Sequence, residues 1–598
     1  MKRLRWIAFS VVLVGCERVV LFRKGQDAST DASDTRAADV VAPQDAQALN
    51  DASSEEAALL DAAAPDVRVV VDAPRPIAPL SAMQLDTNRP MFRWRLAPDS
   101  DGAELEVCST RSCTNVEARA TVAGTEHTLS TALSPGVHFW RLRGRRGASV
   151  GATYSPVWQF YASSSSGRTQ AAWGPMPDFN GDGWLDFAVG DEHPMRGQVS
   201  VYFGSPSGVP PTPSVVFNPG DSNLGFEAAS VGDVNGDGFG DLAVGAPNFA
   251  GTPGSNGTVL VYFGSARGLA AGMAQRLSGA SFSSGFGAAI TSIGDFDADG
   301  FGDVAIASIF RSAGGTVEVY RGSAGGLDSS SYQLLSGLDP GGEFGHDLSS
   351  ADLDRDGVNE LLVGVPRALS NRGRALLAMG SRSGFIEPLR ELVPQSMSGT
   401  VTEPGQPGPL FGRSLRVVGD IDGDGFFEFV VNAPYDENGS VAVYRGADTV
   451  ARDQRPTPRL VLRGDGASTG TGFGFSLAAL GDTNGDGLDD VAIGAPGDRV
   501  DADPTAGRVL VYRGSSASLL EATPSVLLGA PGHVGLGETI TIADVDGVAP
   551  FDVIGGGAAH NANGSVDLFS LDRTGARWVG RRTDTSGLWF SKRGLSER

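Results

Sequence analysis

A nine-residue pattern, D-x-[DN]-x-D-G-x-x-[DE], recurs through most of this 598-residue chain. A degenerate copy begins at Asp544. The six complete copies begin at Asp178, Asp233, Asp295, Asp352, Asp420 and Asp482. Successive copies start 55 to 68 residues apart. A repeat of this length accommodates one four-stranded sheet, so we expect an all-β array of similar units, as in a β-propeller.

The pattern supplies oxygen atoms at alternate positions of a tight loop. Calcium takes ~6–8 oxygen ligands and accepts carboxylates, amide oxygens and backbone carbonyls. In the second copy we predict as ligands the side chains of Asp233, Asn235, Asp237 and Asp241 and the carbonyl of Phe239. The glycine at position six permits the sharp turn that such a loop requires.

We number the copies loops 1 to 7 and predict calcium binding in loops 1 to 6 through positions 1, 3, 5, 7 and 9. The predicted ligands are Asp178, Asn180, Asp182, Trp184 and Asp186 in loop 1; Asp233, Asn235, Asp237, Phe239 and Asp241 in loop 2; Asp295, Asp297, Asp299, Phe301 and Asp303 in loop 3; Asp352, Asp354, Asp356, Val358 and Glu360 in loop 4; Asp420, Asp422, Asp424, Phe426 and Glu428 in loop 5; Asp482, Asn484, Asp486, Leu488 and Asp490 in loop 6. The alternative is Asp/Gly-rich turn chemistry without metal, and six intact copies argue against it.

Loop 7 keeps Asp544, Asp546 and Asp552 but carries Val548 at position five, so we expect weak calcium binding or none. The predicted ligand positions of the six complete loops hold 21 carboxylates, close to the formal net charge of −23. Carboxylates clustered in this way repel one another, so a bound cation should stabilise the fold. The same acidic balance argues against nucleic acid as a partner.

Further motifs accompany each loop. Phe-Gly precedes it at 286–287, 344–345, 411–412 and 473–474. Gly-Ala-Pro follows it at 245–247 and 494–496, and G-x-V-x-V-Y-x-G-S follows at 257–265, 315–323 and 507–515. These features resemble the FG-GAP repeats of integrin α-subunits and of many bacterial surface proteins. The loop also resembles the first nine positions of an EF-hand, but position twelve is apolar, as at Val244.

The FG-GAP resemblance implies a seven-bladed β-propeller over residues 165–583, with four strands per blade. It implies calcium loops on one face and a protein or polysaccharide partner on the opposite face. The candidate partner-binding loops are Asn248–Asn256, Pro394–Pro409 and Gly497–Ala506.

Residues 1–16 read as a signal peptide with basic residues before a short apolar run. That run is shorter than the ~20 residues that span a bilayer. Leu13-Val14-Gly15-Cys16 resembles the lipobox of bacterial lipoproteins, which implies lipidation at Cys16 and anchorage in the cell envelope, with the outer membrane favoured. The alternative is a plain secretory signal. Residues 17–79 are rich in Asp and Ala, and we predict a disordered linker.

Residues 80–162 contain alternating apolar segments separated by turn signals, including a strand around Trp94 and another around Trp140. The order of these motifs resembles a fibronectin type III-like β-sandwich. Cys108 and Cys113 are expected to form one disulfide in a secreted chain, and two free thiols are the alternative. Residues 584–598 form a C-terminal tail.

No catalytic constellation emerges, so we expect a binding protein and not an enzyme. The six histidines are scattered, and the absence of lysine between residues 24 and 592 excludes a P-loop. Gly466–Gly470 matches G-x-S-x-G within a polar loop, which is the wrong context for a nucleophile elbow. Arg463-Gly464-Asp465 occupies an ordinary strand-to-loop junction. A structural envelope protein without a specific ligand is the main alternative, and a propeller-bearing hydrolase using Ser468 is a weaker one.

Overall fold

The computed structural model describes residues 71–583, except for 86, 163–171, 192–196, 221–222, 248–255, 271, 273, 281–283, 313, 393–407, 466–471, 499–505, 529–534, 544–551, 558–564 and 573–574. Strands dominate this part of the chain. Besides them it contains a four-residue turn, α1 (Ala368–Asn371), in which Leu369 and Ser370 have positive φ, and a 3-10 turn, η1 (Gly446–Thr449). Within the described residues, no helix has the length and apolar character needed to cross a membrane.

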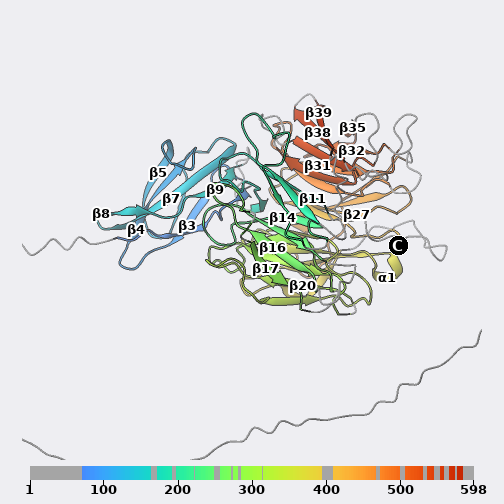
Figure 1. Ribbon diagram of the computed structural model, residues 1–598, viewed down its shortest axis with the longest axis horizontal. Helices are drawn as coiled ribbons and strands as arrows, with labels where there is room; N and C mark the ends of the chain where they lie inside the picture. Colours follow the sequence, from blue (N-terminus) through green and yellow to red (C-terminus); the bar gives the residue numbers. More distant parts are fainter. Residues whose placement is uncertain are drawn as a thin grey trace, which may run out of the picture. The chain divides into compact units, whose positions relative to one another are not determined.

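Two sheets near the N-terminal end of the described region form a β-sandwich (Figure 1). One sheet has the order β1 (Arg75–Ala78), β3 (Met91–Arg95), β6 (Glu126–Thr128). The other has the order β10 (Ala172–Pro175), β2 (Met83–Leu85), β9 (Trp158–Ala162), β7 (Gly136–Arg146), β4 (Gly102–Cys108), β5 (Val116–Ala123), with β8 (Ser149–Tyr154) paired to β7. β1 lies within the segment that the sequence assigned to the linker.

The sandwich core is built from aromatic side chains on alternate strand positions. In β3 the burial alternates residue by residue, so that Phe92 and Trp94 face inward. Phe92 and Trp140 meet edge to face with ring centroids 5.0 Å apart, and Trp158 lies edge-on to Trp140. This contact geometry is favourable for aromatic pairs.

Seven sheets follow, which we call sheets 1 to 7. They are β11 (Phe187–Asp191), β12 (Gln198–Tyr202), β13 (Val215–Phe217); β14 (Glu227–Gly232), β15 (Asp241–Ala246), β16 (Thr258–Tyr262), β17 (Ala274–Ser278); β18 (Phe286–Gly294), β19 (Asp303–Ser308), β20 (Thr316–Tyr320), β21 (Gln333–Ser336); β22 (Leu348–Ala351), β23 (Glu360–Val365), β24 (Arg374–Met379), β25 (Ile386–Glu391); β26 (Leu415–Gly419), β27 (Glu428–Ala433), β28 (Ser440–Tyr444), β29 (Leu460–Arg463); β30 (Leu477–Gly481), β31 (Asp490–Ala495), β32 (Arg508–Tyr512), β35 (Ser525–Leu528); and β36 (Thr539–Ala543), β37 (Asp552–Gly557), β38 (Ser565–Asp572), β39 (Gly575–Thr583). A short ladder of β33 (Gly514–Ser515) and β34 (Leu519–Leu520) accompanies sheet 6.

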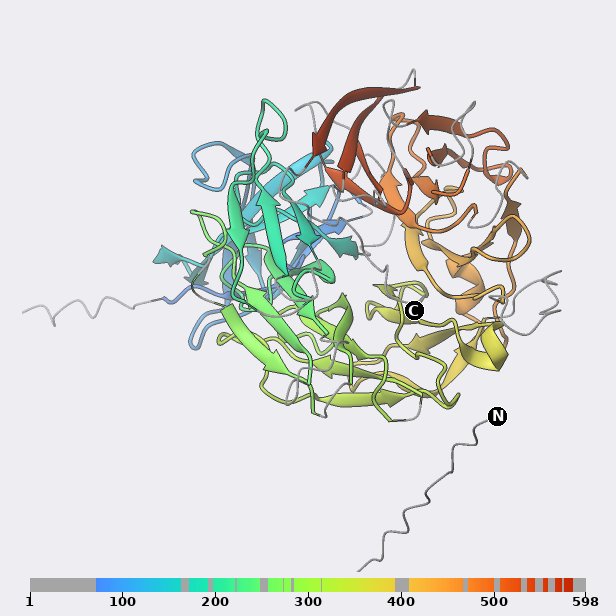
Figure 2. The same cartoon turned by 45° about the vertical axis from the view of Figure 1, so that its right-hand side comes forward.

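Sheets 2 to 7 are four-stranded antiparallel meanders, consistent with the blades of an FG-GAP propeller. The second strand of sheets 2 to 6 is buried at every residue, including the Asp or Glu at position nine with which it begins. Hydrophobic clusters join each sheet to the next in chain order, and Figure 2 shows the sheets following one another around a ring. A last cluster joins Leu568 of sheet 7 to Phe187 of sheet 1.

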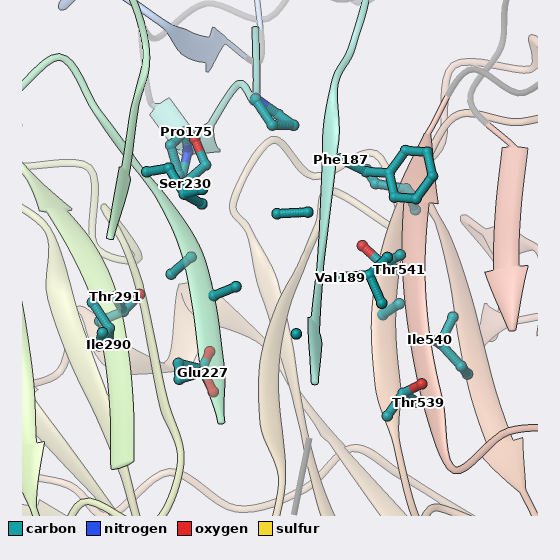
Figure 3. Close-up of a pocket in the computed structure, with 18 of the residues that line it drawn as sticks. Pro175, Phe187, Val189, Glu227, Ser230, Ile290, Thr291, Thr539, Ile540 and Thr541 are labelled. Carbon is teal, nitrogen blue, oxygen red and sulfur yellow. The ribbon is translucent and has the colours of Figure 1, made fainter. Parts of the chain in front are cut away.

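Sheet 1 departs from the expected four strands. The strand that precedes loop 1 in the repeat is β10, and it pairs with β2 of the sandwich instead of with β11. A cavity of about 370 Å³ is lined by residues of β11, β14, β18, β30 and β36, among them Val189, Glu227, Ile290 and Thr539 (Figure 3). The first strands of the sheets therefore enclose a hollow centre.

Candidate metal centres

Loops 2 to 6 each join the first two strands of one sheet, and loop 1 joins β10 to β11. The Asp at position one is the internal anchor of its loop. In loop 2, Asp233 is fully buried and its carboxylate accepts the backbone N–H of Gly236 at 2.6 Å and that of Gly238 at 2.7 Å. Gly238 has a φ of 97°, which a residue with a side chain rarely adopts. Loops 1, 5 and 6 repeat both hydrogen bonds.

The carboxylate at position five shapes the second half of the loop. In loop 2, Asp237 accepts the N–H of Phe239 at 3.0 Å, and the same bond recurs in loops 1, 3, 4, 5 and 6. Such side-chain to backbone bonds stabilise turns that lie outside helix and sheet ladders. The position-five carboxylate thereby fixes the backbone at position seven.

The carboxylate at position nine ties the loop to the end of the third strand. Asp241 is fully buried and accepts the N–H of Val234 and that of Gly264, each at 2.9 Å. Loops 1, 3, 4 and 6 have the same pair of bonds. The sequence predicted position nine only as a ligand, and the tie to the Gly of the V-Y-x-G-S motif is a second role that the spacing did not reveal.

Three loops hold acidic clusters that can bind a metal ion. In each cluster, one oxygen per residue lies within 4.8 Å of the others: Asp295, Asp297 and Asp299; Asp352, Asp354 and Asp356; Asp420, Asp422 and Glu428. Two buried oxygens in these loops, Asp352 Oδ1 and Glu428 Oε1, have no hydrogen-bond partner. Anionic oxygens held close together and left unpaired fit a hard cation such as Ca²⁺.

Loops 1, 2 and 6 bring positions three and five together through an amide. The Asn Nδ2 at position three lies 2.8–3.0 Å from the Asp Oδ2 at position five, in the pairs Asn180–Asp182, Asn235–Asp237 and Asn484–Asp486. We call these the Asn-type loops and call loops 3, 4 and 5 the Asp-type loops. The side chains of positions three and five also converge in loops 3 and 4, whereas the cluster of loop 5 joins positions one, three and nine.

The pKa values of the anchoring carboxylates are raised, mainly by burial. The pKa is raised to about 7 for Asp178, Asp233, Asp295 and Asp352. The pKa of Glu428 is raised to about 10 by burial and by the neighbouring charges of Asp422 and Asp424. A carboxylate whose charged form is this costly requires either a proton or a nearby cation. The loops are therefore electrostatically prepared for a positive ion.

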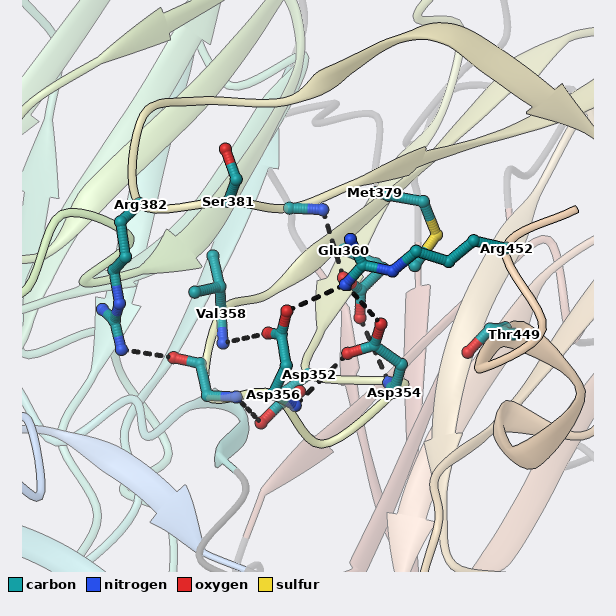
Figure 4. Close-up of polar contacts among 12 residues, drawn as sticks. Asp352, Asp354, Asp356, Val358, Glu360, Met379, Ser381, Arg382, Thr449 and Arg452 are labelled. Carbon is teal, nitrogen blue, oxygen red and sulfur yellow. Dashed lines mark hydrogen bonds and ion pairs between the residues drawn. The ribbon is translucent and has the colours of Figure 1, made fainter.

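Each Asp-type loop also has an arginine on its position-three carboxylate. Arg321 lies 3.1 Å from Asp297, Arg452 lies 2.9 Å from Asp354, and Arg445 contacts Asp422. Arg321 and Arg445 occupy the same repeat position, x of V-Y-x-G, so the motif itself carries a signal for this contact. Arg452 instead lies in the connection between β28 and β29 and reaches loop 4 from there (Figure 4).

The sandwich contributes a buried cation to loops 1 and 2. Arg111 donates to the carbonyls of Gly181 at 3.2 Å and Gly238 at 2.7 Å, and to Gln159 Oε1 at 2.7 Å. Its guanidinium lies 3.8 Å from the ring centroid of Phe239, the position-seven residue of loop 2. The sequence contained no signal for this contact, because Arg111 belongs to a different domain.

Arg111 lies in the short turn that the Cys108–Cys113 disulfide closes. Several predicted features fall outside the described residues: Cys16, the linker up to residue 70, the tail 584–598, Ser468, and Asp544 and Asp546 of loop 7. Of the candidate partner-binding loops, residues 248–255, 393–407 and 499–505 are also outside. Asp552 begins β37, but its side chain is not described.

Segments of the repeats described above match known repeat families and known proteins. Residues 226–262, 411–444 and 473–512 match the FG-GAP repeat, and residues 252–363 match the FG-GAP-like repeat. The chain is 32% identical to integrin alpha-4 of Xenopus laevis over 32% of its own length and 16% of that protein. It is 33% identical to integrin alpha-7 of Homo sapiens over 28% of its length and 13% of that protein, and 32% identical to integrin alpha-V of Gallus gallus over 34% and 21%. The chain thus spans only a small part of these relatives, and it carries FG-GAP repeats with distant similarity to integrin alpha subunits.

Proposed function

We propose that this protein is a calcium-stabilised, seven-bladed β-propeller that binds a protein or polysaccharide ligand without catalysing a reaction. The single observation that carries the proposal is the recurrence of one acidic loop between the first two strands of successive sheets. Ca²⁺ would neutralise the clustered carboxylates there. The side chains at positions one, three and five, with the position-seven carbonyl, would hold it, and position nine would link each site to its sheet.

The strand order defines where a ligand would bind. Because the strands alternate in direction, loops 2 to 6 lie at one edge of their sheets, and the turns after the second and fourth strands lie at the other. Three exposed apolar side chains lie in such turns of sheets 3 and 4: Phe310, Leu338 and Leu369, of which Leu338 is 91% exposed. Exposed apolar groups gathered on one face are typical of an interaction surface.

Neighbouring contacts hold these turns together. The Arg367 N–H donates to the carbonyl of Gly342 at 3.2 Å, and Arg374 Nη1 lies 2.9 Å from Asp339 Oδ2. The turns carrying Leu338 and Leu369 therefore form one continuous surface between sheets 3 and 4. We take this surface, with the three longer loops predicted from the sequence, as the ligand face.

The full chain, with and without calcium, applied to arrays of purified glycans and matrix proteins tests this function. We expect calcium-dependent capture that Leu338→Asp abolishes. Val526→Asp is the matched control, because Val526 is 46% exposed in β35, the fourth strand of sheet 6, and lies in none of these turns and in no metal loop. Absence of capture by any array member would favour a structural envelope protein, and calcium-independent hydrolysis of a glycan or phosphodiester would favour an enzyme.

We also propose that lipid on Cys16 anchors the protein in a bacterial envelope, with the acidic linker holding the fibronectin type III-like sandwich and the propeller away from the membrane. The supporting observation is the lipobox-like sequence before Cys16. The Cys16→Ser variant should move from the membrane fraction to the soluble fraction of a bacterial host. Equal partition of both forms would contradict the anchor.

A further inference from the structure

Loop 4 differs from the other loops in the cation that contacts it. Arg452 Nη2 lies 2.9 Å from Asp354 Oδ2 and 3.0 Å from Asp356 Oδ2, so that a single guanidinium nitrogen bridges positions three and five (Figure 4). In loop 3, Arg321 is paired to the position-three carboxylate. The Arg452 nitrogen thus contacts two of the oxygens that a metal ion in loop 4 would need.

The chain brings Arg452 to this place from the next sheet. Arg452 belongs to the connection between β28 and β29 of sheet 5, and we call residues 449–455 the bridging segment. Arg390 of β25, in sheet 4, donates to the carbonyls of Thr449 at 2.8 Å and Ala451 at 2.9 Å. These bonds hold the bridging segment against sheet 4 independently of Arg452.

The Arg452 contact itself is accessible and weakly held. The side chain of Arg452 is 46% exposed and that of Asp356 37% exposed, whereas the side chain of Asp354 is 5% exposed. An ion pair with this exposure stabilises a protein only slightly, because water screens it and long side chains lose freedom in forming it. A divalent ion coordinated by several oxygens would compete effectively for the same atoms.

We infer that Arg452 is a displaceable internal cation of loop 4, which occupies the Asp354 and Asp356 oxygens until a divalent metal ion replaces it. Metal binding then costs the loss of the ion pair, so loop 4 binds calcium more weakly than the Asn-type loops do. Metal binding also frees the Arg452 side chain from sheet 4, while Arg390 still holds the bridging segment. This inference rests on the proposed calcium function and names a residue that sets the affinity of one site.

Calcium titration of the full chain by calorimetry tests the affinity. Arg452→Gln should tighten the weakest class of sites by roughly twofold to fivefold, the range expected for a lost exposed ion pair. Arg455→Gln is the matched control, because Arg455 lies in the same segment but pairs with Glu391, which belongs to no loop. Asp354→Asn, which recreates the Asn-type sequence in loop 4, should remove most of the difference between wild type and Arg452→Gln.

Limited trypsin digestion followed by mass spectrometry gives a second readout. Trypsin cleaves after Arg452, whereas Pro456 blocks cleavage after Arg455. Calcium should increase cleavage after Arg452 relative to cleavage after Arg146, an exposed arginine at the turn between β7 and β8 of the sandwich. The chelated protein should show the lower ratio.

The outcomes separate this inference from the proposed function. If calcium changes neither the melting temperature nor the heat of binding of the wild-type chain, the calcium function itself is wrong. If calcium stabilises the chain but Arg452→Gln and Arg455→Gln titrate alike, or calcium protects the bond after Arg452, then Arg452 is not displaced and this inference alone is wrong.

Discussion

Arg111 and Arg452 both reach metal loops from other parts of the chain, and they contact different atoms. Arg111 of the sandwich donates to the carbonyls of Gly181 and Gly238, at positions four and six of loops 1 and 2. Arg452 contacts the carboxylates at positions three and five of loop 4. The carbonyls are not predicted ligands, whereas the carboxylates are. Arg111 can therefore remain in place when a metal ion binds, whereas Arg452 competes with the metal ion for the same oxygens.

The two arginines also differ in their surroundings. Arg111 lies between the rings of Phe139 and Phe239, and burial lowers the pKa of its guanidinium to about 10 despite the nearby Asp178. Arg452 is half-exposed and ends on an acidic loop. Hydrogen bonds of a buried charged group stabilise a fold more than an exposed ion pair does. We therefore expect substitutions of Arg111 and of Arg452 to change the free energy of unfolding by different amounts and with different dependence on calcium.

The largest effect expected is a reversal of pH dependence at buried carboxylates of the metal loops that neither Arg111 nor Arg452 neutralises through an ion pair. In the chelated protein the pKa of Asp352 is about 7 when folded and near 3.8 when unfolded, so the folded state binds more protons between these values. The free energy of unfolding of the chelated protein should therefore fall as the pH rises from about 4 to 7. Each such group contributes at most about 1.4 kcal/mol per pH unit to this fall.

Glu428, with a folded pKa of about 10, extends this loss to higher pH. With saturating calcium the trend should reverse, because the ion binds the ionised carboxylates and protons compete with it. Thermal melts between pH 5 and 8 with calcium or chelator measure both trends. A chelated protein that is more stable at pH 8 than at pH 5 would contradict the burial of these groups.

Arg111→Ala should give the next largest effect. It removes donors from two loop carbonyls, from Val157 and from Gln159, and we expect a loss of about 3 kcal/mol, since bonds to charged groups contribute ~1.5–3 kcal/mol each. The loss should be similar with calcium and with chelator. Arg95→Ala, at an exposed position of β3 in the same domain, is the control. Equal effects of both variants would show that the Arg111 contact does not hold the loops.

Removal of the disulfide should have a smaller effect of the same kind. The Cys108–Cys113 bond closes a short loop, for which loop-closure entropy gives about 2 kcal/mol. A Cys108→Ser and Cys113→Ser double variant should lower the melting temperature with and without calcium. Combined with Arg111→Ala, its effect should be less than additive, because both changes act on one turn. Full additivity of the two losses would mean that the disulfide does not support the Arg111 contact.

Arg452→Ala should give the smallest effect and the opposite calcium dependence. We expect a loss below about 1 kcal/mol in chelator, as for other exposed ion pairs, and no loss or a slight gain in calcium. Chemical denaturation in chelator and in calcium measures the sign of the change in the free energy of unfolding. A loss that is larger in calcium than in chelator would mean that Arg452 supports the bound ion.

The repeats were predictable because their determinants are local. All predicted side-chain ligands of one loop lie within nine residues, and the Gly-Ala-Pro and V-x-V-Y motifs lie in or next to the strands that follow. The sequence predicted the four-stranded sheets and the convergence of acidic side chains for this reason.

Features that depend on distant parts of the chain were not predictable. Arg111 is separated by 70 residues from Gly181 and by 127 from Gly238. β10 was expected to complete sheet 1, yet it pairs with β2, since the sandwich offers it a free sheet edge. The double role of position nine also depends on a glycine about twenty residues further on, as Gly264 shows for Asp241. No local pattern encodes these pairings.

Thermal unfolding of the full chain in calcium and in chelator at neutral pH tests the central claim most directly. A ligand at one hundred times its dissociation constant contributes about 2.7 kcal/mol per site, and six such sites should raise the melting temperature by roughly 10 °C or more. Magnesium at the same concentration should give a smaller shift, because it prefers octahedral sites that retain water. Identical melting in calcium and in chelator would contradict the assignment of the loops as metal sites.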